Sequence, residues 1–241
     1  MRFIADTHIH SIASNHAYST VMENIAVAKQ RGLLYMAMTE HAPTMPDAPH
    51  IWHIVNQWEV PSVYEGLNIL HGAEVNILDK DGSLDLSKEI LSGLEWVIAS
   101  MHRACFAPST EECHTQTWLN VAKNPHVDVI GHSGDQNYAF DHEKVIRAFK
   151  EYGKIVEINN SSLHGGRLGA DKNCADIARL CKKLEVPVVV NSDSHFAGNI
   201  GLFPHAEKML TEIGFPEKLV INANIDTFEE IVAQKRAGLV R

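Results

Sequence analysis

The chain has 241 residues, 45% of them hydrophobic, and a formal net charge of −9. This length and composition predict one globular domain with a sizeable core, spanning residues 1–241. The acidic balance argues against extended DNA or RNA binding, because a phosphate backbone would be repelled. No stretch approaches the roughly 18 consecutive apolar residues of a membrane-spanning helix.

The four cysteines form no C-x-x-C pair, which argues against a zinc ribbon or a thioredoxin-like site. We find no signal peptide and therefore expect a cytoplasmic protein with free thiols. Histidine is the outlier of the composition, with 15 copies scattered along the chain. Histidines of this number and distribution indicate metal binding.

In chain order, short apolar runs alternate with amphipathic segments. The apolar runs predict buried strands near residues 2–10, 33–38, 68–73, 96–100, 127–131, 154–158 and 187–190. Helices are expected near residues 20–32, 51–65, 109–123, 141–153, 171–184, 204–213 and 226–237, with a short strand at 218–222. Thr20 and Glu23 have the spacing of a capping box at the start of the first helix.

This alternation predicts an α/β fold with a parallel sheet covered by helices, and about seven repeats favour a (β/α) barrel. Active sites of such barrels lie at the carboxyl ends of the strands. Nine metal-type residues occupy those predicted ends and the loops after them: His8, His10, His16, His41, Glu74, His102, His132, Asp193 and His195.

A single histidine at a strand end is more often structural, but six strands that end in this way favour a metal centre. One catalytic zinc takes about three protein ligands, so nine ligands fit two or three metals. Glu74 could bridge two of them, because a carboxylate has two oxygens.

The motifs D-T-H-I-H (6–10), T-E-H (39–41), G-A-E (72–74), M-H (101–102), G-H (131–132) and S-D-S-H (192–195) resemble the polymerase and histidinol phosphatase (PHP) superfamily. Segments 11–20, 47–50 and 157–162 are similar to its YcdX-like phosphatase branch. The resemblance implies a distorted, TIM-like (β/α)7 barrel with three divalent metal ions, usually zinc and in some members manganese or iron.

Carried over to this chain, the resemblance implies three ligand sets. The first is His8, His10, Glu74 and Asp193; the second is Glu74, His102 and His132; the third is His16, His41 and His195. Asp6 resembles a carboxylate that orients a ligand histidine.

Metal ions that lie close together lower the pKa of bound water and neutralise phosphate oxygens, so we expect a metal-bound hydroxide to hydrolyse a phosphate monoester. Asp193 and His195 are assigned to catalysis as well as to metal binding. Arg167, in a glycine-flanked loop, is a candidate phosphate clamp, and His164 in that loop a candidate general acid. For Arg103 a phosphate contact and a solvated surface position are equally weighted.

The remaining histidines receive structural or peripheral roles. His50 and His53 either line a substrate pocket or belong to a packed helix start, and His71 is expected to be structural. Four more are assigned to the surface: His114, His126, His142 and His205.

The expected substrate is a small phosphorylated molecule, and a homo-oligomer is compatible with the sequence. Alternatives are a phosphodiesterase or 3′–5′ exonuclease, which the missing basic stripe disfavours, and a histidinol phosphatase. In a further alternative, the chain is a non-catalytic module whose metals only stabilise the fold.

Overall fold

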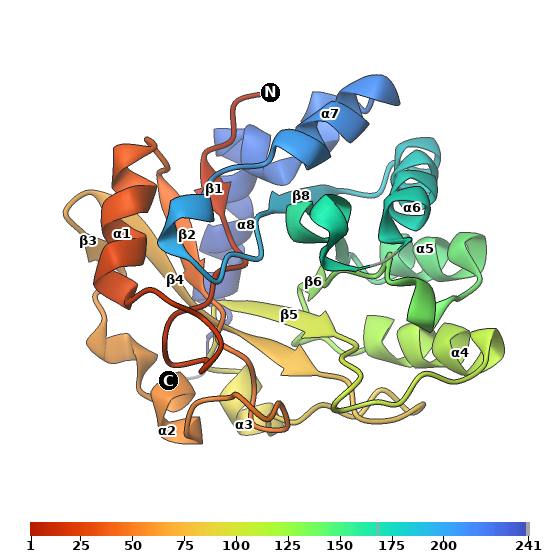
Figure 1. The fold of residues 1–241 in the computed structure, drawn as a ribbon, viewed down its shortest axis with the longest axis horizontal. Coiled ribbons are helices and arrows are strands. Elements are labelled where there is room, and N and C mark those ends of the chain that lie inside the picture. The colour runs from red at the N-terminus through yellow and green to blue at the C-terminus, as the bar shows by residue number, and fades with distance from the viewer. Residues whose placement is uncertain (168, 240–241) are drawn as a thin grey trace.

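The computed structural model describes residues 1–167 and 169–239. At its centre is one sheet in which parallel strands follow one another in chain order: β1 (Ala5–Asp6), β2 (Tyr35–Met38), β4 (Leu67–Asn76), β5 (Trp96–Ser100), β6 (Val129–Ile130), β7 (Ile155–Asn159) and β8 (Val188–Asn191). The short β3 (Val63–Tyr64) pairs antiparallel with the start of β4. The strands curl around the middle of the molecule (Figure 1), so the predicted (β/α)7 barrel is confirmed.

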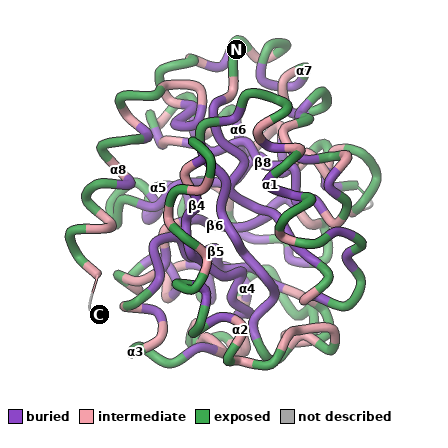
Figure 2. The backbone as a smooth tube through the Cα atoms, turned by 90° about the vertical axis from the view of Figure 1, so that its left-hand side faces the viewer, coloured by how far each residue is buried: buried purple, intermediate pink, exposed green. Residues whose placement is uncertain are grey.

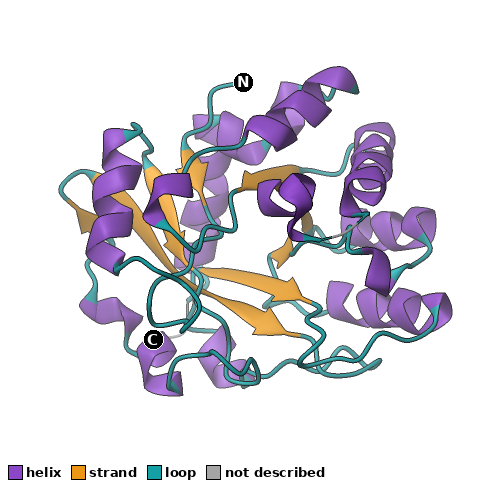
Figure 3. Cartoon of the chain, viewed as in Figure 1, coloured by secondary structure: helices purple, strands orange, loops and turns teal. Residues whose placement is uncertain are grey.

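Helices cover the outside of this sheet (Figure 3). They are α1 (Val21–Gln30), α2 (Ile51–Val55), α3 (Lys88–Leu91), α4 (Glu111–Ala122), α5 (His142–Glu151), α6 (Ala170–Leu184), α7 (Pro204–Glu212) and α8 (Ile225–Ala237). Shorter helical turns are η1 (Gln57–Glu59), η2 (Gln136–Tyr138), η3 (Ser162–Gly166), η4 (Ala197–Asn199), η5 (Glu217–Leu219) and η6 (Ile221–Ala223). The capping box that opens α1 is confirmed, because Thr20 and Glu23 each accept a backbone hydrogen bond from the other. No helix among the described residues is long and apolar enough to cross a membrane.

The seam between β1 and β8 closes the barrel without a regular strand ladder. At the end nearest the functional residues, a parallel bridge joins Ile9 to Ser194. At the other end, the side chain of Asn222 replaces strand pairing: its Oδ1 accepts from Val190 N, and its Nδ2 donates to the backbone oxygens of Ala5 and Val190. An amide side chain can do this because it carries both donors and an acceptor.

The core lies on both faces of the sheet, and buried backbone runs through the middle of the molecule (Figure 2). Every residue of β5 is buried, as expected for a parallel strand covered on both sides. Cys174 and Cys181, both on α6, are free thiols buried in the apolar core, consistent with packing roles.

Three predicted elements differ from the structure. The expected strand at 2–10 is regular only over Ala5–Asp6, because the chain then turns into the functional loop. The expected helix at 51–65 divides into α2, η1 and β3. The expected strand at 218–222 consists of η5 and η6 with one bridge, Val188 to Val220, since this segment fills the seam rather than extending the sheet.

Candidate metal centre

The nine predicted ligand residues come together at the carboxyl ends of the strands. Glu74 projects from β4, two residues before that strand ends at Asn76. The others lie in the loops that follow β1, β2, β5, β6 and β8. All but three of the nine are buried; His102 and His195 are half-buried, and His16 is exposed.

Glu74 is the centre of this group, and its two oxygens face different histidines. Oε2 lies 3.3 Å from His8 Nε2, 3.6 Å from His10 Nε2 and 2.8 Å from His41 Nδ1. Oε1 lies 2.9 Å from His132 Nε2 and 3.4 Å from His102 Nε2. One carboxylate therefore separates two sets of imidazole nitrogens.

Asp193 completes the first set. Its Oδ1 lies 3.6 Å from His8 Nε2 and 3.4 Å from His10 Nε2. The backbone of Asp193 has φ +54°, in the left-handed region that costs a non-glycine residue free energy. Such strain at a ligand position indicates that the surrounding structure fixes the carboxylate.

Three further histidines border the first set on its exposed side. The ring of His195 stacks on that of His10, with centroids 4.3 Å apart, and is tilted against that of His16 at 4.2 Å. His41 stacks on His10 at 4.3 Å and lies 5.4 Å from the His16 ring. Ligand atoms of His10, His41 and His195 lie within 4.8 Å of one another, as do those of His16, His41 and Asp47.

Several of these ligand atoms are buried without a hydrogen bond. They are His8 Nε2, both ring nitrogens of His10, His41 Nδ1, Glu74 Oε2 and His195 Nε2. A buried polar atom without a partner is costly, and a group of such atoms aimed at one another fits a shared cation. Imidazole and carboxylate groups in this arrangement fit divalent metals such as zinc.

The pKa values of these side chains reflect both burial and the charges of their neighbours. Burial disfavours the Glu74 carboxylate, yet His8 and His102 hold its pKa well below the ordinary value. Burial also opposes a charge on His8, but Glu157 and Glu74 raise the pKa of His8 well above its ordinary value. Burial and the neighbouring His41 lower the pKa of His10. The pKa values of the neighbouring His8 and His10 therefore shift in opposite directions, so their two imidazoles do not favour protonation together.

One histidine of each set is oriented by a residue that sequence reasoning missed. Glu157 Oε1 accepts from His8 Nδ1 at 2.7 Å, and Asn76 Oδ1 lies 2.7 Å from His102 Nδ1. Asp47 Oδ2 lies 2.6 Å from the Nδ1 of His16. A signal for Glu157 was present, since a carboxylate inside the apolar run of β7 must have a buried partner.

The expected role of Asp6 is wrong. Its Oδ1 accepts from Ser192 N and its Oδ2 from Gly201 N, so it anchors the loop after β8; within the described part of the chain it makes no hydrogen bond to a histidine. Glu157 reaches His8 instead, because its inward-facing position on β7 lies beneath the histidine, whereas Asp6 faces the seam.

Arg167 lies beside the ligand group, and its Nη1 donates to Asp193 Oδ2 at 3.3 Å and to Ser162 Oγ at 2.9 Å. His164, from η3 in the same loop, is exposed and stacks on His205 with ring centroids 4.6 Å apart. Among the described contacts, none joins His164 to the nine residues. Arg103 is exposed, which favours the solvated alternative.

The structure shows how five of the other histidines compare with the roles expected for them. His71 Nε2 donates to the Val60 backbone oxygen at 2.8 Å, in agreement with a structural role. The surface assignment of His114 is wrong: this residue is 1% exposed and accepts a hydrogen bond from Ser109 N. Its helix, α4, turns the imidazole toward the core. His205 is exposed as expected, and His126 and His142 are half-buried.

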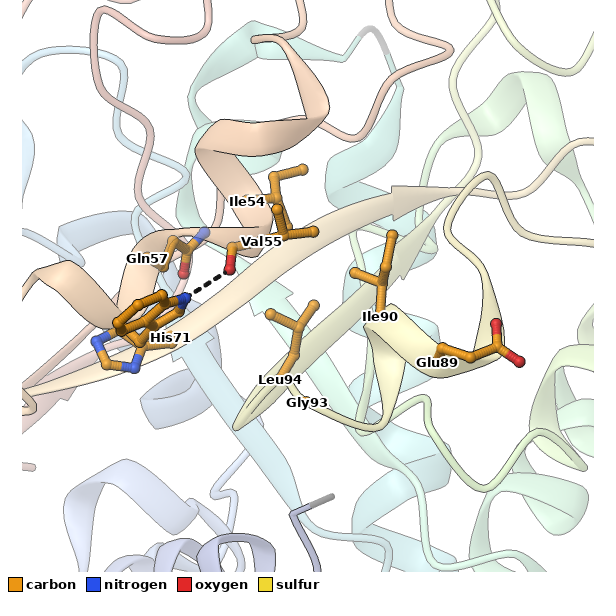
Figure 4. Close-up of a pocket in the computed structure, with 9 residues that line it drawn as sticks. Ile54, Val55, Gln57, His71, Glu89, Ile90, Gly93 and Leu94 are labelled. Atoms are coloured by element: carbon orange, nitrogen blue, oxygen red, sulfur yellow. Dashed lines mark hydrogen bonds between the residues drawn. The ribbon is translucent and has the colours of Figure 1, made fainter. Parts of the chain in front are cut away.

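A separate cavity of about 300 Å³ lies outside the sheet beside β4 (Figure 4). Apolar side chains of α2 and α3 line it together with Trp58 and His71. His71 precedes Glu74 on β4, and none of the nine ligand candidates lines this cavity. The cavity is therefore distinct from the ligand group.

Comparison with known proteins places this arrangement in a family. The model of the PHP domain matches residues 6–161. The chain belongs to the PHP domain family. A protein of Photobacterium profundum named "Probable phosphatase" is 43% identical over 98% of this chain and 96% of its own length. One of the same name from Thermoanaerobacter sp. is 45% identical over 98% of this chain and 97% of its own.

A solved PHP-type fold agrees with the barrel described above. The histidinol phosphate phosphatase of Lactococcus lactis, determined with zinc, L-histidinol and phosphate, superposes with a TM-score of 0.64 at 18% identity. The match covers 90% of this chain and 95% of that one. At this identity the likeness shows a shared fold.

Proposed function

We propose that the chain is a metal-dependent phosphatase that hydrolyses phosphate monoesters of a small molecule at a centre of three divalent metal ions, with zinc the first choice. The observation that carries this proposal is the placement of Glu74, whose two oxygens face two separate histidine sets. The names of the relatives at 43% and 45% identity support the activity.

The described residues supply a ligand set for each metal. His8, His10, Glu74 and Asp193 would hold the first ion, and Glu74, His102 and His132 the second. His16, His41 and His195 would hold the third. Manganese or iron could use the same nitrogen and oxygen ligands, so metal analysis decides the identity.

Metals bound here would supply Lewis acidity toward the phosphoryl oxygens and lower the pKa of nearby water. The ligands carry only two carboxylate charges, Glu74 and Asp193, so the loaded site would be strongly cationic and select anions. Arg167 adds a guanidinium beside Asp193, and we assign it to phosphate binding. We assign Asp193 and His195 to the reaction because Asp193 contacts Arg167 and His195 lies beside Asp193.

His164 is our candidate for donating a proton to the leaving group, since it lies on the same loop as Arg167. The choice of ester tests this role. His164→Ala should lower kcat for an alkyl phosphate, whose leaving group needs a proton. It should leave p-nitrophenyl phosphate hydrolysis unchanged, because that leaving group departs without one. Equal effects on both substrates would contradict the assignment.

The acidic net charge of −9 favours a small phosphomonoester over a nucleic-acid strand. The test is hydrolysis of p-nitrophenyl phosphate by the purified protein loaded with zinc or manganese, with and without a chelator. Parallel assays use single-stranded DNA and histidinol phosphate as substrates. Absence of turnover with every divalent metal would contradict the proposal.

His10→Ala separates catalysis from a purely structural metal centre. The variant should lose at least about a hundredfold in kcat/KM while keeping its circular dichroism spectrum. A variant that unfolds instead would favour the non-catalytic alternative.

A further inference from the structure

Glu157 is a buried carboxylate at the centre of β7, 3% exposed, directly beneath the candidate metal ligands. Its Oε1 accepts from His8 Nδ1 at 2.7 Å and from Asn191 Nδ2 at 2.9 Å. Its Oε2 accepts from the backbone N of His132 at 2.7 Å and from Asn159 Nδ2 at 3.1 Å. Four donors thus converge on one carboxylate, which offers about four acceptor positions.

The contact with His8 determines which ring nitrogen can bind a metal. A carboxylate can only accept, so the proton of the neutral imidazole must sit on Nδ1. The Nε2 atom then presents its lone pair to the side where Glu74 and Asp193 lie, at 3.3 and 3.6 Å. Glu157 therefore fixes the tautomer and the ring orientation of a first-set ligand.

The contact with His132 acts on the second set through the backbone. His132 has φ +24°, a conformation that a residue with a side chain rarely adopts. Its N–H is held by Glu157 Oε2, while its ring nitrogen lies 2.9 Å from Glu74 Oε1. Release of the backbone would let the loop relax and move the ring away from Glu74.

A third link runs through Asn159, which donates from Nδ2 both to Glu157 Oε2 and to Asp193 Oδ2, each at 3.1 Å. Glu157 thereby contacts His8 and His132 directly and is linked to Asp193 through Asn159, so it connects candidate ligands that follow three different strands. The third set has no comparable link to it among the described residues, because His16 is oriented by Asp47 instead.

We propose that Glu157 is a positioning residue that makes the first and second metal sites interdependent, and that the third site does not depend on Glu157. This inference rests on the proposed metal centre. Glu157 would be a buried residue on which both sites depend, and it would neither bind a metal nor touch substrate.

The test is metal content per chain by elemental analysis after dialysis, for wild type and Glu157→Gln. Wild type should retain three equivalents. Glu157→Gln should retain one, with affinities at the first two sites lowered about 10- to 100-fold. The matched control is Glu95→Gln: Glu95 is also 3% exposed and accepts from His71 N and Arg236 Nε, but lies before β5 at the opposite end of the barrel. It should retain three.

The outcomes separate this inference from the proposed function. A wild-type protein that binds no metal overturns both. Three equivalents in wild type and in Glu157→Gln, with equal affinities, overturn the inference alone. Loss of a single metal from Glu157→Gln also overturns it, because the two sites would then be independent.

Nitrogen NMR of the wild-type protein tests the role of Glu157 even if the Glu157→Gln variant does not fold. In zinc-loaded protein, His8 should show a protonated Nδ1 and a metal-bound Nε2. A metal-bound Nδ1 would overturn the assignment of Glu157, since that nitrogen could not then donate to the carboxylate.

Discussion

His16 Nδ1 lies 2.6 Å from Asp47 Oδ2, and both residues belong to loops rather than strands. The His16 side chain is 52% exposed, whereas those of His8 and His10 are completely buried. A backbone hydrogen bond from Asn15 N to Asp47 O, at 2.8 Å, joins the same two loops. The proposed third ligand set therefore depends on a contact between two surface loops.

We predict that the third metal is the most weakly held. Asp47→Asn should lower affinity at this site about 10- to 100-fold, the usual effect of removing an orienting partner. Elemental analysis after dialysis against a weak chelator should find two metals in the variant. Asp81→Asn, at an exposed turn, is the control. Retention of three metals by Asp47→Asn would contradict the prediction.

Metal binding should release protons. In the metal-free protein, carboxylates raise the pKa of His8 and, through Glu74, the pKa of His41, against the effect of burial. Both imidazoles must be neutral to bind a metal. Metal affinity should therefore increase with pH until the pH exceeds the raised pKa values, and should then level off. Zinc titration calorimetry near neutral pH, in buffers of different ionisation enthalpy, measures the protons released. Heats independent of the buffer would show the prediction to be wrong.

Arg167→Ala should raise KM for a phosphate monoester about 10- to 100-fold, corresponding to about 1.5–3 kcal/mol for a charged hydrogen bond. Arg167→Lys should recover part of this loss, because an ammonium keeps the charge but lacks the planar fork. Metal content should remain that of wild type. Steady-state kinetics at saturating metal is the measurement, and an unchanged KM in Arg167→Ala would exclude a role in phosphate binding.

Asp6 should give stability a distinct pH dependence. Burial raises the pKa of Asp6 from 3.8 to about 6, so the native state takes up this proton more readily than the unfolded chain. This difference stabilises the native state fully below the pKa of the unfolded chain, 3.8, and the stabilisation is lost as the pH rises to about 6. The free energy of unfolding thereby falls by about 3 kcal/mol.

Asp6→Asn should remove this dependence. Urea unfolding of the metal-free protein at several pH values between 4 and 7 compares the two chains. The asparagine oxygen cannot serve both Ser192 N and Gly201 N, so activity should also fall as the loop after β8 loses an anchor. Parallel stability curves for wild type and variant would refute the assignment.

Sequence patterns predicted the barrel because its parallel strands are short, apolar and regularly spaced, and they predicted which residues follow those strands. They failed where tertiary contacts decide. Val220 lies in an apolar run typical of a strand, but the seam admits only a single bridge there. His114 has ordinary helical neighbours in sequence, and its burial comes with tertiary contacts, among them those with Tyr138 and Phe106.

The orienting residues were harder still to predict. Asp6 and Glu157 are both carboxylates in apolar runs, and their spacing in sequence does not show which one reaches His8. That choice depends on the direction in which each strand turns its side chain within the closed barrel. Asp47 meets His16 only because two loops, far apart in sequence, cross at the rim.

The seam has a consequence for the order of folding. His8 and Asp193 lie on opposite sides of it. The described residues join the backbone there through the Ile9–Ser194 bridge and through side chains such as Asn222 and Asp6, without a regular strand ladder. The proposed first ligand set is thus incomplete until the C-terminal third of the chain has docked onto β1, a closure over a long loop. An ion bound there would connect the first and last strands of the sheet. Metal loading would therefore be the last step of maturation, and it would stabilise the closed barrel by mass action.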